Sequence, residues 1–264
     1  MIAQILTTFG FSALLAIAIG MALGFFQEKF KLVRDPLVDE VRAALPGANC
    51  GGCGYPGCDG YAEAAATGAA PTNRCGAGGA STAAALAALV GGGAEAEDLV
   101  SVLRCGGTKA KASPRGNYVG VPGCRAARLC AGSVKACSWG CQGFGDCIAV
   151  CKFGALSMSE SGLPRVDRAK CTGCGMCVAE CPQKLFALVP RERRGPMALC
   201  ANKSTRKDVI KECKAGCIKC EACVRACPEN CIEIVDGMPV TDHSRCTVCG
   251  ACVDACPTKC YILP

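Results

Sequence analysis

Three short cysteine runs constrain the fold of this chain more than any other feature of its sequence. Each run places thiols at positions i, i+3, i+6 and i+10, and a proline follows the fourth thiol. The runs are CTGCGMCVAECP (Cys171–Pro182), CIKCEACVRACP (Cys217–Pro228) and CTVCGACVDACP (Cys246–Pro257). Segments this short bury too little apolar surface to fold alone, so cross-links or metals must supply much of their stability.

The whole chain is rich in cysteine, which leaves disulfides, zinc and iron–sulfur clusters as candidates. It has 27 cysteines and 33 glycines among 264 residues, and only 5% of its residues are aromatic. The odd cysteine count argues against a framework made of disulfides alone. The topology predicted below also places the cysteines in the cytosol, where thiols stay reduced. Both observations favour metal binding.

The spacing of the runs favours iron–sulfur clusters over zinc. A tight loop with thiols at i, i+3 and i+6 can reach three corners of one cubane, and the fourth thiol serves a neighbouring cluster. The proline fixes φ and turns the chain away after that thiol. Zinc ribbons instead use two C-x₂-C knuckles around one tetrahedral ion. Four thiols in each of three runs are too dense for a zinc ribbon.

An uncharged stretch near the N-terminus predicts a membrane anchor. Residues Ile2–Phe26 carry no charge, and as a helix at ~1.5 Å per residue they would span about 37 Å. A cleaved signal peptide is the alternative, but no Lys or Arg precedes the run, which is also long for a signal sequence. Lys29, Lys31, Arg34 and Arg42 follow it. The positive-inside rule then predicts a single-pass protein of the cell (inner or plasma) membrane, with its later domains on the cytoplasmic side.

The formal net charge of +7 does not require a nucleic-acid partner, and we expect none. The sequence has no run of five or more basic residues, and aromatic residues are too sparse for base stacking. A [4Fe–4S]²⁺ core held by four thiolates carries about −2, so five such clusters would bring the chain to roughly −3. The basic residues are then counter-charge.

Secondary structure is predicted to be short and mixed. Asp35–Leu45 predicts an amphipathic helix, and the Ala-rich segment Gly76–Leu103 predicts one or two weak helices around Gly91–Gly93. Gly106–Gly123 predicts a loop. From Cys137 onward the cysteine runs repeat, which predicts four half-modules in two pairs, each with a cysteine loop, a turn and a short strand. The predicted class is α+β.

The two pairs resemble tandem bacterial ferredoxin modules that each bind two [4Fe–4S] clusters. The first run of the earlier module, CSWGCQGFGDCIAVC (Cys137–Cys151), departs from the ferredoxin spacing and lacks the proline. The resemblance implies four ligand sets: set 2 (Cys137, Cys141, Cys147, Cys181), set 3 (Cys151, Cys171, Cys174, Cys177), set 4 (Cys217, Cys220, Cys223, Cys256) and set 5 (Cys227, Cys246, Cys249, Cys252).

A different cysteine pattern lies close to the anchor. The segment NCGGCGYPGC (Asn49–Cys58) is followed by Cys75, and its glycines let the backbone approach a bulky cofactor. We name Cys50, Cys53, Cys58 and Cys75 set 1. From spacing alone, set 1 suits either a zinc ion or a cluster.

The order of an anchor, CGGCGYPGC and paired ferredoxin modules resembles the B subunit of the Rnf (Rsx) complex, an ion-translocating ferredoxin:NAD⁺ oxidoreductase. The resemblance implies that set 1 binds a [4Fe–4S] cluster and that the chain carries five clusters. It also implies that the chain passes electrons between soluble ferredoxin and other membrane and peripheral subunits. The alternative is a membrane-tethered polyferredoxin that serves another reductase, such as one reducing a redox-sensing regulator.

The predicted organisation has six segments. They are an anchor (1–28), a small mainly helical [4Fe–4S] domain (29–104), a loop-rich connector (105–136), a first ferredoxin-like module (137–190), a basic linker (191–214) and a second module (215–264). No dinucleotide fingerprint or flavin-attachment motif stands out. We therefore expect no bound NAD or flavin and no substrate-converting site. The lone His243 is predicted to be an exposed turn residue.

Seven cysteines lie outside the five sets. Cys231 and Cys260 take a position that Ala155 has in the first half-module, which predicts a packing role. Cys105, Cys124 and Cys130 are either packing residues or ligands of a sixth cluster completed by Cys200 or Cys213. The linker is basic and predicts either a docking face for acidic ferredoxin or a solvated face that balances cluster charge. Its basic residues are Arg191, Arg193, Arg194, Lys203, Arg206, Lys207 and Lys211.

Overall fold

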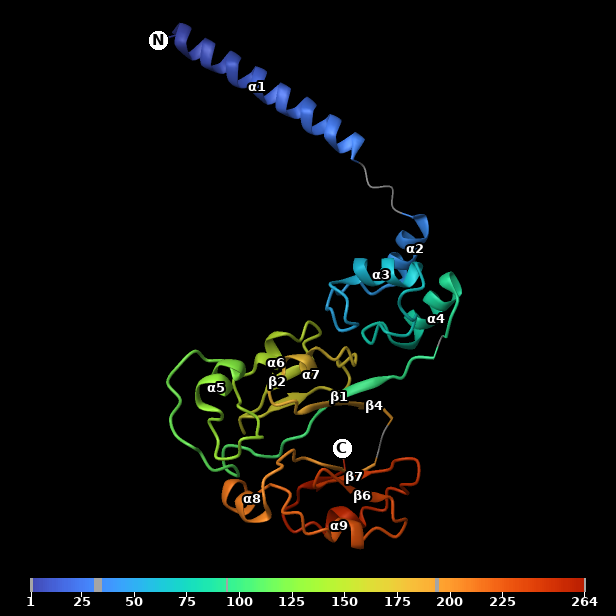
Figure 1. Ribbon diagram of the computed structural model, residues 1–264, viewed down its shortest axis with the longest axis vertical. Helices are drawn as coiled ribbons and strands as arrows, with labels where there is room; N and C mark the ends of the chain where they lie inside the picture. The colour runs from blue at the N-terminus through green and yellow to red at the C-terminus, as the bar shows by residue number, and fades with distance from the viewer. Residues whose placement is uncertain (1, 31–34, 94, 193–194, 264) are drawn as a thin grey trace. The chain divides into compact units, whose positions relative to one another are not determined.

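The computed structural model describes residues 2–30, 35–93, 95–192 and 195–263 (Figure 1). Lys31 and Arg34, next to the predicted anchor, and Arg193 and Arg194 of the linker lie outside the described residues. Contacts divide the chain into two compact units, Met1–Asp39 and Glu40–Pro264. The six predicted segment boundaries remain predictions.

The first unit is dominated by one apolar helix, α1 (Ile2–Lys29). Its segment Phe9–Lys29 has a mean hydropathy of 2.1 and no buried residues, and no other helix in the described ranges is long and apolar enough to cross a membrane. Large apolar side chains such as Phe11, Leu14 and Ile17 are exposed along it. A helix of this length without a polar face fits a single-pass membrane anchor.

The second unit begins within α2, the first of three helices that each bury an apolar side chain. Within α2 (Pro36–Ala44), predicted as an amphipathic helix, Val41 is fully buried. Helices α3 (Cys58–Ala66) and α4 (Gly79–Val90) bury Tyr61 and Leu86. The Tyr61 hydroxyl donates a hydrogen bond to the Pro71 carbonyl at 2.8 Å, so the ring is packed and its polar end is satisfied.

Strand β1 (Leu99–Leu103) corrects one prediction, because a weak helix was expected over part of this segment. It pairs antiparallel with β4 (Phe186–Pro190), from Leu99↔Pro190 to Leu103↔Phe186. The sequence LVSVL is rich in β-branched residues, which favour strands. Its partner is far away in the sequence, so the local Ala-rich context hid the strand.

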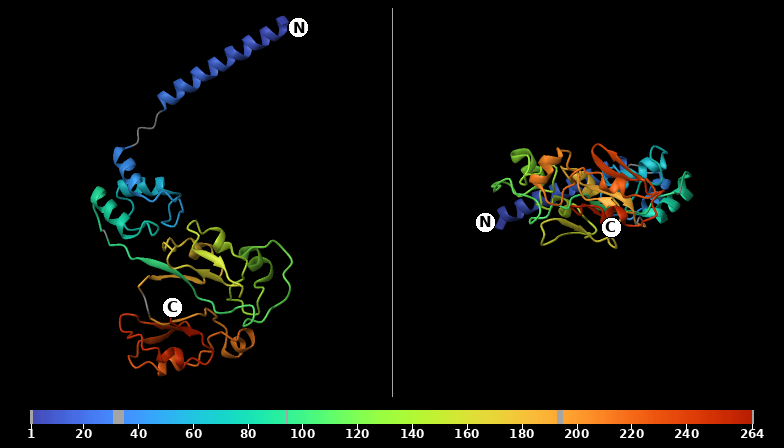
Figure 2. Two further views of the ribbon diagram at one scale, coloured as in Figure 1. Left: turned by 180° about the vertical axis from the view of Figure 1, so that it is seen from behind. Right: turned by 90° about the horizontal axis from the view of Figure 1, so that it is seen from below.

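Three further two-stranded sheets complete the strands of the described residues (Figure 2). They pair β2 (Leu156–Met158) with β3 (Pro164–Val166), β5 (Met197–Ala198) with β8 (Tyr261–Ile262), and β6 (Ile232–Val235) with β7 (Met238–Thr241). Two more helices, α5 (Cys124–Ala131) and α8 (Arg206–Glu212), lie outside the cysteine runs. Mixed short helices and small antiparallel sheets agree with the α+β prediction.

Four short helices repeat one local backbone. Each begins directly after a residue with positive φ and carries a cysteine at its second position, on α6 (Asp146–Ala149), α7 (Met176–Glu180), α9 (Ala222–Arg225) and α10 (Ala251–Asp254). The preceding residues are Gly145, Gly175, Glu221 and Gly250, with φ of 87°, 81°, 57° and 80°. Glycine adopts this conformation at little cost, and Glu221 is the exception. The four half-modules therefore share a frame in which Cys147, Cys177, Cys223 and Cys252 are equivalent.

Candidate metal centres

Every cysteine is a free thiol, and most are buried or half-buried. Within the part of the chain that the structure describes, no three His, Cys, Asp or Glu side chains are spaced to hold a single metal ion. Several cavities are instead lined by four or five thiols each. Apolar walls with thiol donors suit iron–sulfur clusters, which are held by cysteine thiolates.

The structure brings the four thiols of set 1 together around one cavity, together with Tyr61 and Gly57. Gly51 and Gly54 have φ of 75° and 89°, so the loop curls in a way that other residues rarely allow. The Asn49 side-chain oxygen accepts a hydrogen bond from the Cys58 N–H at 2.8 Å. Burial raises the pKa of the Cys75 thiol, and the other three thiols of the set raise it further. The four thiols of set 1 therefore lie close together.

The thiols of set 3 also lie close together. Burial raises the pKa of Cys177, and the thiols of Cys174 and Cys171 lie close enough to raise it further. Cys151 similarly raises the pKa of Cys174, after burial and the thiol of Cys50. The influence of Cys50, a member of set 1, indicates that sets 1 and 3 are neighbours.

Two glycines allow the loops of sets 1 and 3 to approach each other closely. A Cβ built on Gly52 would lie 2.1 Å from the carbonyl oxygen of Cys174, and one built on Gly76 would lie 2.9 Å from that of Gly173. Cys174 also lines the cavity of set 1. The loop that carries Cys174 therefore rests directly on the backbone of the set 1 loops.

Three of the four predicted members of set 2 line one cavity. The cavity at this position is lined by Cys124, Cys141, Cys147 and Cys181, which we name the Cys124 pocket, and Cys137 is not among its lining residues. Burial raises the pKa of Cys147 to about 12, and the thiols of Cys141 and Cys124 raise it more than those of Cys181 and Cys177.

Helix α5 delivers Cys124 to this pocket. The Asp146 carboxylate accepts hydrogen bonds from the backbone N–H groups of Cys124 at 2.8 Å and Arg125 at 3.2 Å. It thereby caps the first turn of α5 and fixes it to the loop that carries Cys147.

The sequence contains one sign that the loop from Cys141 to Cys147 lacks a thiol. In the shared frame of the half-modules, Cys141 takes position i and Cys147 takes position i+6. Phe144 then stands at i+3, where the other three runs have cysteine. The loop therefore lacks one of the regular thiols, and the Cys124 thiol reaches the same pocket from α5.

The second module gathers both of its predicted sets. All four thiols of set 4 line one cavity. Burial raises the pKa of Cys252, and the other members of set 5, Cys227, Cys249 and Cys246, raise it further.

The cysteines and histidine outside the sets have varied surroundings. Cys231 and Cys260 are buried in the core of the second module, as their predicted packing role requires. Cys130 is exposed. His243, predicted to be exposed, is half-buried in the turn after β7 and packs against Gly195.

Thiol-lined cavities and repeated half-modules, which follow one apolar helix along the chain, define the class of membrane-anchored iron–sulfur proteins. Family models agree: "Putative Fe-S cluster" matches residues 45–76, "4Fe-4S binding domain" matches 163–187 and "4Fe-4S dicluster domain" matches 216–260.

Similar proteins identify the family. The B subunit of the Na⁺-translocating ferredoxin:NAD⁺ oxidoreductase complex of Acetobacterium woodii is 41% identical over 93% of this chain and 74% of its own length. The B subunit of the ion-translocating oxidoreductase complex of Methanosarcina acetivorans is 39% identical over 88% of both chains. The B subunit of the proton-translocating ferredoxin:NAD⁺ oxidoreductase complex of Clostridium ljungdahlii is 38% identical over 88% of this chain and 82% of its own. The chain belongs to the B-subunit family of ion-translocating (Rnf) oxidoreductase complexes.

Proposed function

We propose that this chain relays electrons between soluble ferredoxin and the membrane redox subunits of an ion-translocating ferredoxin:NAD⁺ oxidoreductase. Its relatives are named as B subunits of ion-translocating oxidoreductase complexes, and its 4Fe-4S domains suit it to electron transfer within such a complex. The observation that carries the proposal is that thiols from separate segments converge on cavities that adjoin one another.

Five sites fit [4Fe–4S] clusters: set 1, the Cys124 pocket, and sets 3, 4 and 5. Each brings four thiols together, all of them buried or half-buried except the exposed Cys249 of set 5. Bound clusters would supply reversible one-electron storage. The chain's own residues hold the thiols at fixed separations and exclude water. Cys124 replaces Cys137 in this proposal, because the structure places Cys124 beside Cys141, Cys147 and Cys181.

The first three sites form a continuous path. Set 1 meets set 3 where Gly52 contacts Cys174. Cys147 of the Cys124 pocket and Cys177 of set 3 lie in one buried core, and Cys151 and Cys181 pack against it. The crossing of thiols between the two loops is the ligand arrangement of two-cluster ferredoxins.

A basic face on α8 supports docking of an acidic ferredoxin. Arg206, Lys207 and Lys211 are exposed on this helix. Arg191, by contrast, has a structural role: its guanidinium pairs with Asp98 at 2.7 Å and donates to the Cys171 carbonyl at 2.6 Å. Lys203 is partly engaged with Asp236 at 3.4 Å. The proposed docking face is therefore narrower than the basic linker and centres on α8.

Basic residues after the apolar helix indicate on which side of the membrane the iron–sulfur unit lies. Lys29 ends α1, and Arg42 follows within α2. By the positive-inside rule, the iron–sulfur unit faces the cytoplasm, where reduced ferredoxin is available.

Reconstitution of the complex in liposomes tests the proposal. With this chain present, reduced ferredoxin should drive both NAD⁺ reduction and ion uptake, and both should stop when the chain is left out. The contrary result is that ion uptake continues in liposomes that lack the chain, while reduced ferredoxin still reduces the purified chain. That result would make the chain a tethered polyferredoxin for another reductase.

A further inference from the structure

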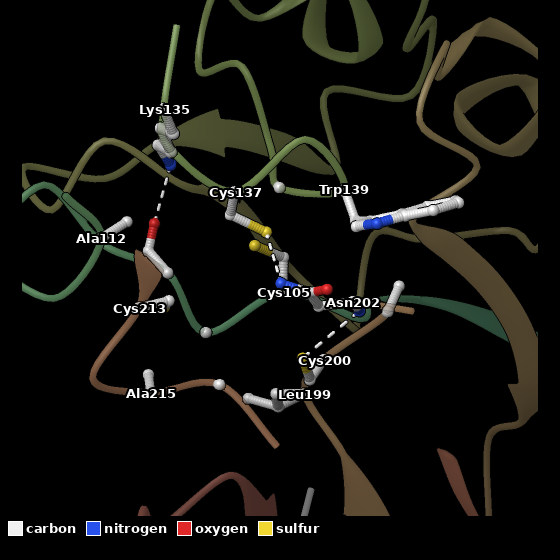
Figure 3. Close-up of a pocket in the computed structure, with 15 residues that line it drawn as sticks. Cys105, Ala112, Lys135, Cys137, Trp139, Leu199, Cys200, Asn202, Cys213 and Ala215 are labelled. Carbon is white, nitrogen blue, oxygen red and sulfur yellow. Dashed lines mark hydrogen bonds between the residues drawn. The ribbon is translucent and has the colours of Figure 1, made fainter. Parts of the chain in front are cut away.

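Four cysteines outside the five sites line a cavity of their own (Figure 3). We name this cavity, lined by Cys105, Cys137, Cys200 and Cys213, the Cys105 pocket. The thiols come from four segments: after β1, after α5, after β5 and at the end of α8. Cys137, Cys200 and Cys213 are buried, and Cys105 is half-buried.

The four thiols are mutual neighbours. A Cβ built on Gly107 would lie 3.4 Å from the Cys213 sulfur and 3.6 Å from the Cys105 sulfur. Burial raises the pKa of Cys137 to about 11, and the nearby thiols of Cys200 and Cys105 contribute to the rise. The pKa of Cys213 is raised by burial and then by the thiols of Cys105 and Cys200.

Hydrogen-bond donors point at three of these sulfurs. The Asn202 side-chain amide donates to Cys137 Sγ at 3.3 Å, and the Asn202 backbone N–H donates to Cys200 Sγ at 3.4 Å. The backbone N–H of Cys141 points at Cys105 Sγ at 3.5 Å. Asn202 is 1% exposed, and Glu212 Oε2 accepts from its amide at 2.8 Å, which fixes its orientation. Donors of this kind favour sulfur that carries negative charge.

A buried cation also lines the Cys105 pocket. Lys135 lines the pocket and is 9% exposed, and its ammonium donates to the Gly107 carbonyl at 2.7 Å. A carbonyl is a neutral acceptor, and a buried ammonium is costly unless negative charge lies nearby. Thiolates around a bound cluster would supply that charge.

The pocket lies between two proposed cluster sites. On one side, Cys105 accepts from the N–H of Cys141, a member of the Cys124 pocket. On the other side, a hydrogen bond from the Cys260 thiol lowers the pKa of both Cys200 and Cys217, so Cys200 adjoins set 4. Cys200 also belongs to the core of the second module.

We propose that Cys105, Cys137, Cys200 and Cys213 bind a sixth [4Fe–4S] cluster, which joins the two ferredoxin-like modules into one path. The inference rests on the proposed relay and completes it. The four thiols would hold the cluster as thiolates, having released their protons to solvent. The bound cluster would supply storage of one electron between the two modules.

Metal counting on the anaerobically purified full-length chain tests the site. We expect about 24 irons and as many sulfides per chain, against about 20 for five clusters, and native mass spectrometry of the unmodified protein should give the same count. Cys213→Ser and Cys105→Ser should each lose about four irons. The double variant should also lose only about four, because both residues serve one cluster.

Cys130→Ser is the matched control and should keep every iron, since Cys130 is exposed and lines none of the thiol pockets described above. About 20 irons in the unmodified protein, or one zinc lost together with Cys213, would overturn the sixth cluster and leave the five-cluster relay standing. Little iron in any variant would overturn both. Native mass spectrometry of the unmodified chain decides the count even if a variant fails to fold.

Discussion

The Ser101 hydroxyl lies 3.1 Å from the Cys177 sulfur, and the Ser101 backbone N–H points at the Cys171 sulfur at 3.4 Å. Ser101 is 2% exposed and sits on β1, outside the cysteine runs. A strand from a separate segment therefore supplies two donors to set 3. Hydrogen bonds to cluster sulfurs stabilise the reduced, more negative state and raise its potential.

We expect Ser101→Ala to lower the reduction potential of one cluster. A net hydrogen-bond energy of roughly 1 kcal/mol corresponds to about 40 mV for one electron. An EPR-monitored redox titration measures the shift, and Ser101→Thr, which keeps the hydroxyl, should show a smaller one. Equal potentials in Ser101→Ala and the unmodified protein would show that the hydroxyl does not tune set 3.

We expect Gly52→Ala to disturb the contact between sets 1 and 3. Its new methyl would overlap the Cys174 carbonyl, a backbone atom that cannot rotate away, so one loop must shift. Overpacking of this kind costs about 1–3 kcal/mol in the free energy of unfolding. Anaerobic denaturant titration measures the loss, and rapid-freeze EPR should show slower electron exchange between the two sites. Gly93→Ala, at a position with open space around it, should change neither.

We expect Cys124→Ser to remove one cluster, because Cys124 stands where Cys137 was predicted. The loss should be about four irons per chain. Cys130→Ser, on the same helix, is the control and should lose none. A full iron count in Cys124→Ser would return Cys137 to the Cys124 pocket.

We expect charge reversal on α8 to slow reduction by ferredoxin. Arg206→Glu combined with Lys207→Glu should lower the second-order rate constant about tenfold or more at low ionic strength, since steering of this kind changes on-rates by about 10–10³. The difference should shrink at high salt, where the screening length falls to about 3 Å at 1 M. Stopped-flow reduction measures both effects.

The matched control for α8 changes the net charge equally elsewhere. Arg165 and Lys170 are both exposed in the first module. Arg165→Glu combined with Lys170→Glu should leave the rate of reduction unchanged. A similar loss of rate in this control would show that net charge alone, and not a docking face on α8, governs the reaction.

The sequence can predict those thiols of a site that are close together along the chain. The regular runs at Cys171, Cys217 and Cys246 each carry the spacing of three thiols, and the resemblance to ferredoxins implies the fourth member of sets 3, 4 and 5. The proposed replacement of Cys137 by Cys124 could not be predicted in this way, because α5 reaches the pocket only through tertiary packing. Phe144 at the missing position was the one local trace of it.

The strand β1 escaped prediction for the same physical reason. Its hydrogen bonds go to β4, which follows far later in the chain, and strand propensity alone is a weak guide in an Ala- and Gly-rich context. The amphipathic pattern of α2 and the apolar run of α1, by contrast, depend on neighbouring residues and were predicted correctly.

The pairing of β1 with β4 also bears on where electron flow through the chain can be controlled. The whole of β1 is paired with a strand of the first module, and the glycine contacts at Gly52 and Gly76 hold set 1 against the loop that carries Cys174. The distances that an electron must cross in this half of the chain are then constant from one turnover to the next. We therefore expect any gate on the flow to act where electrons enter or leave the chain.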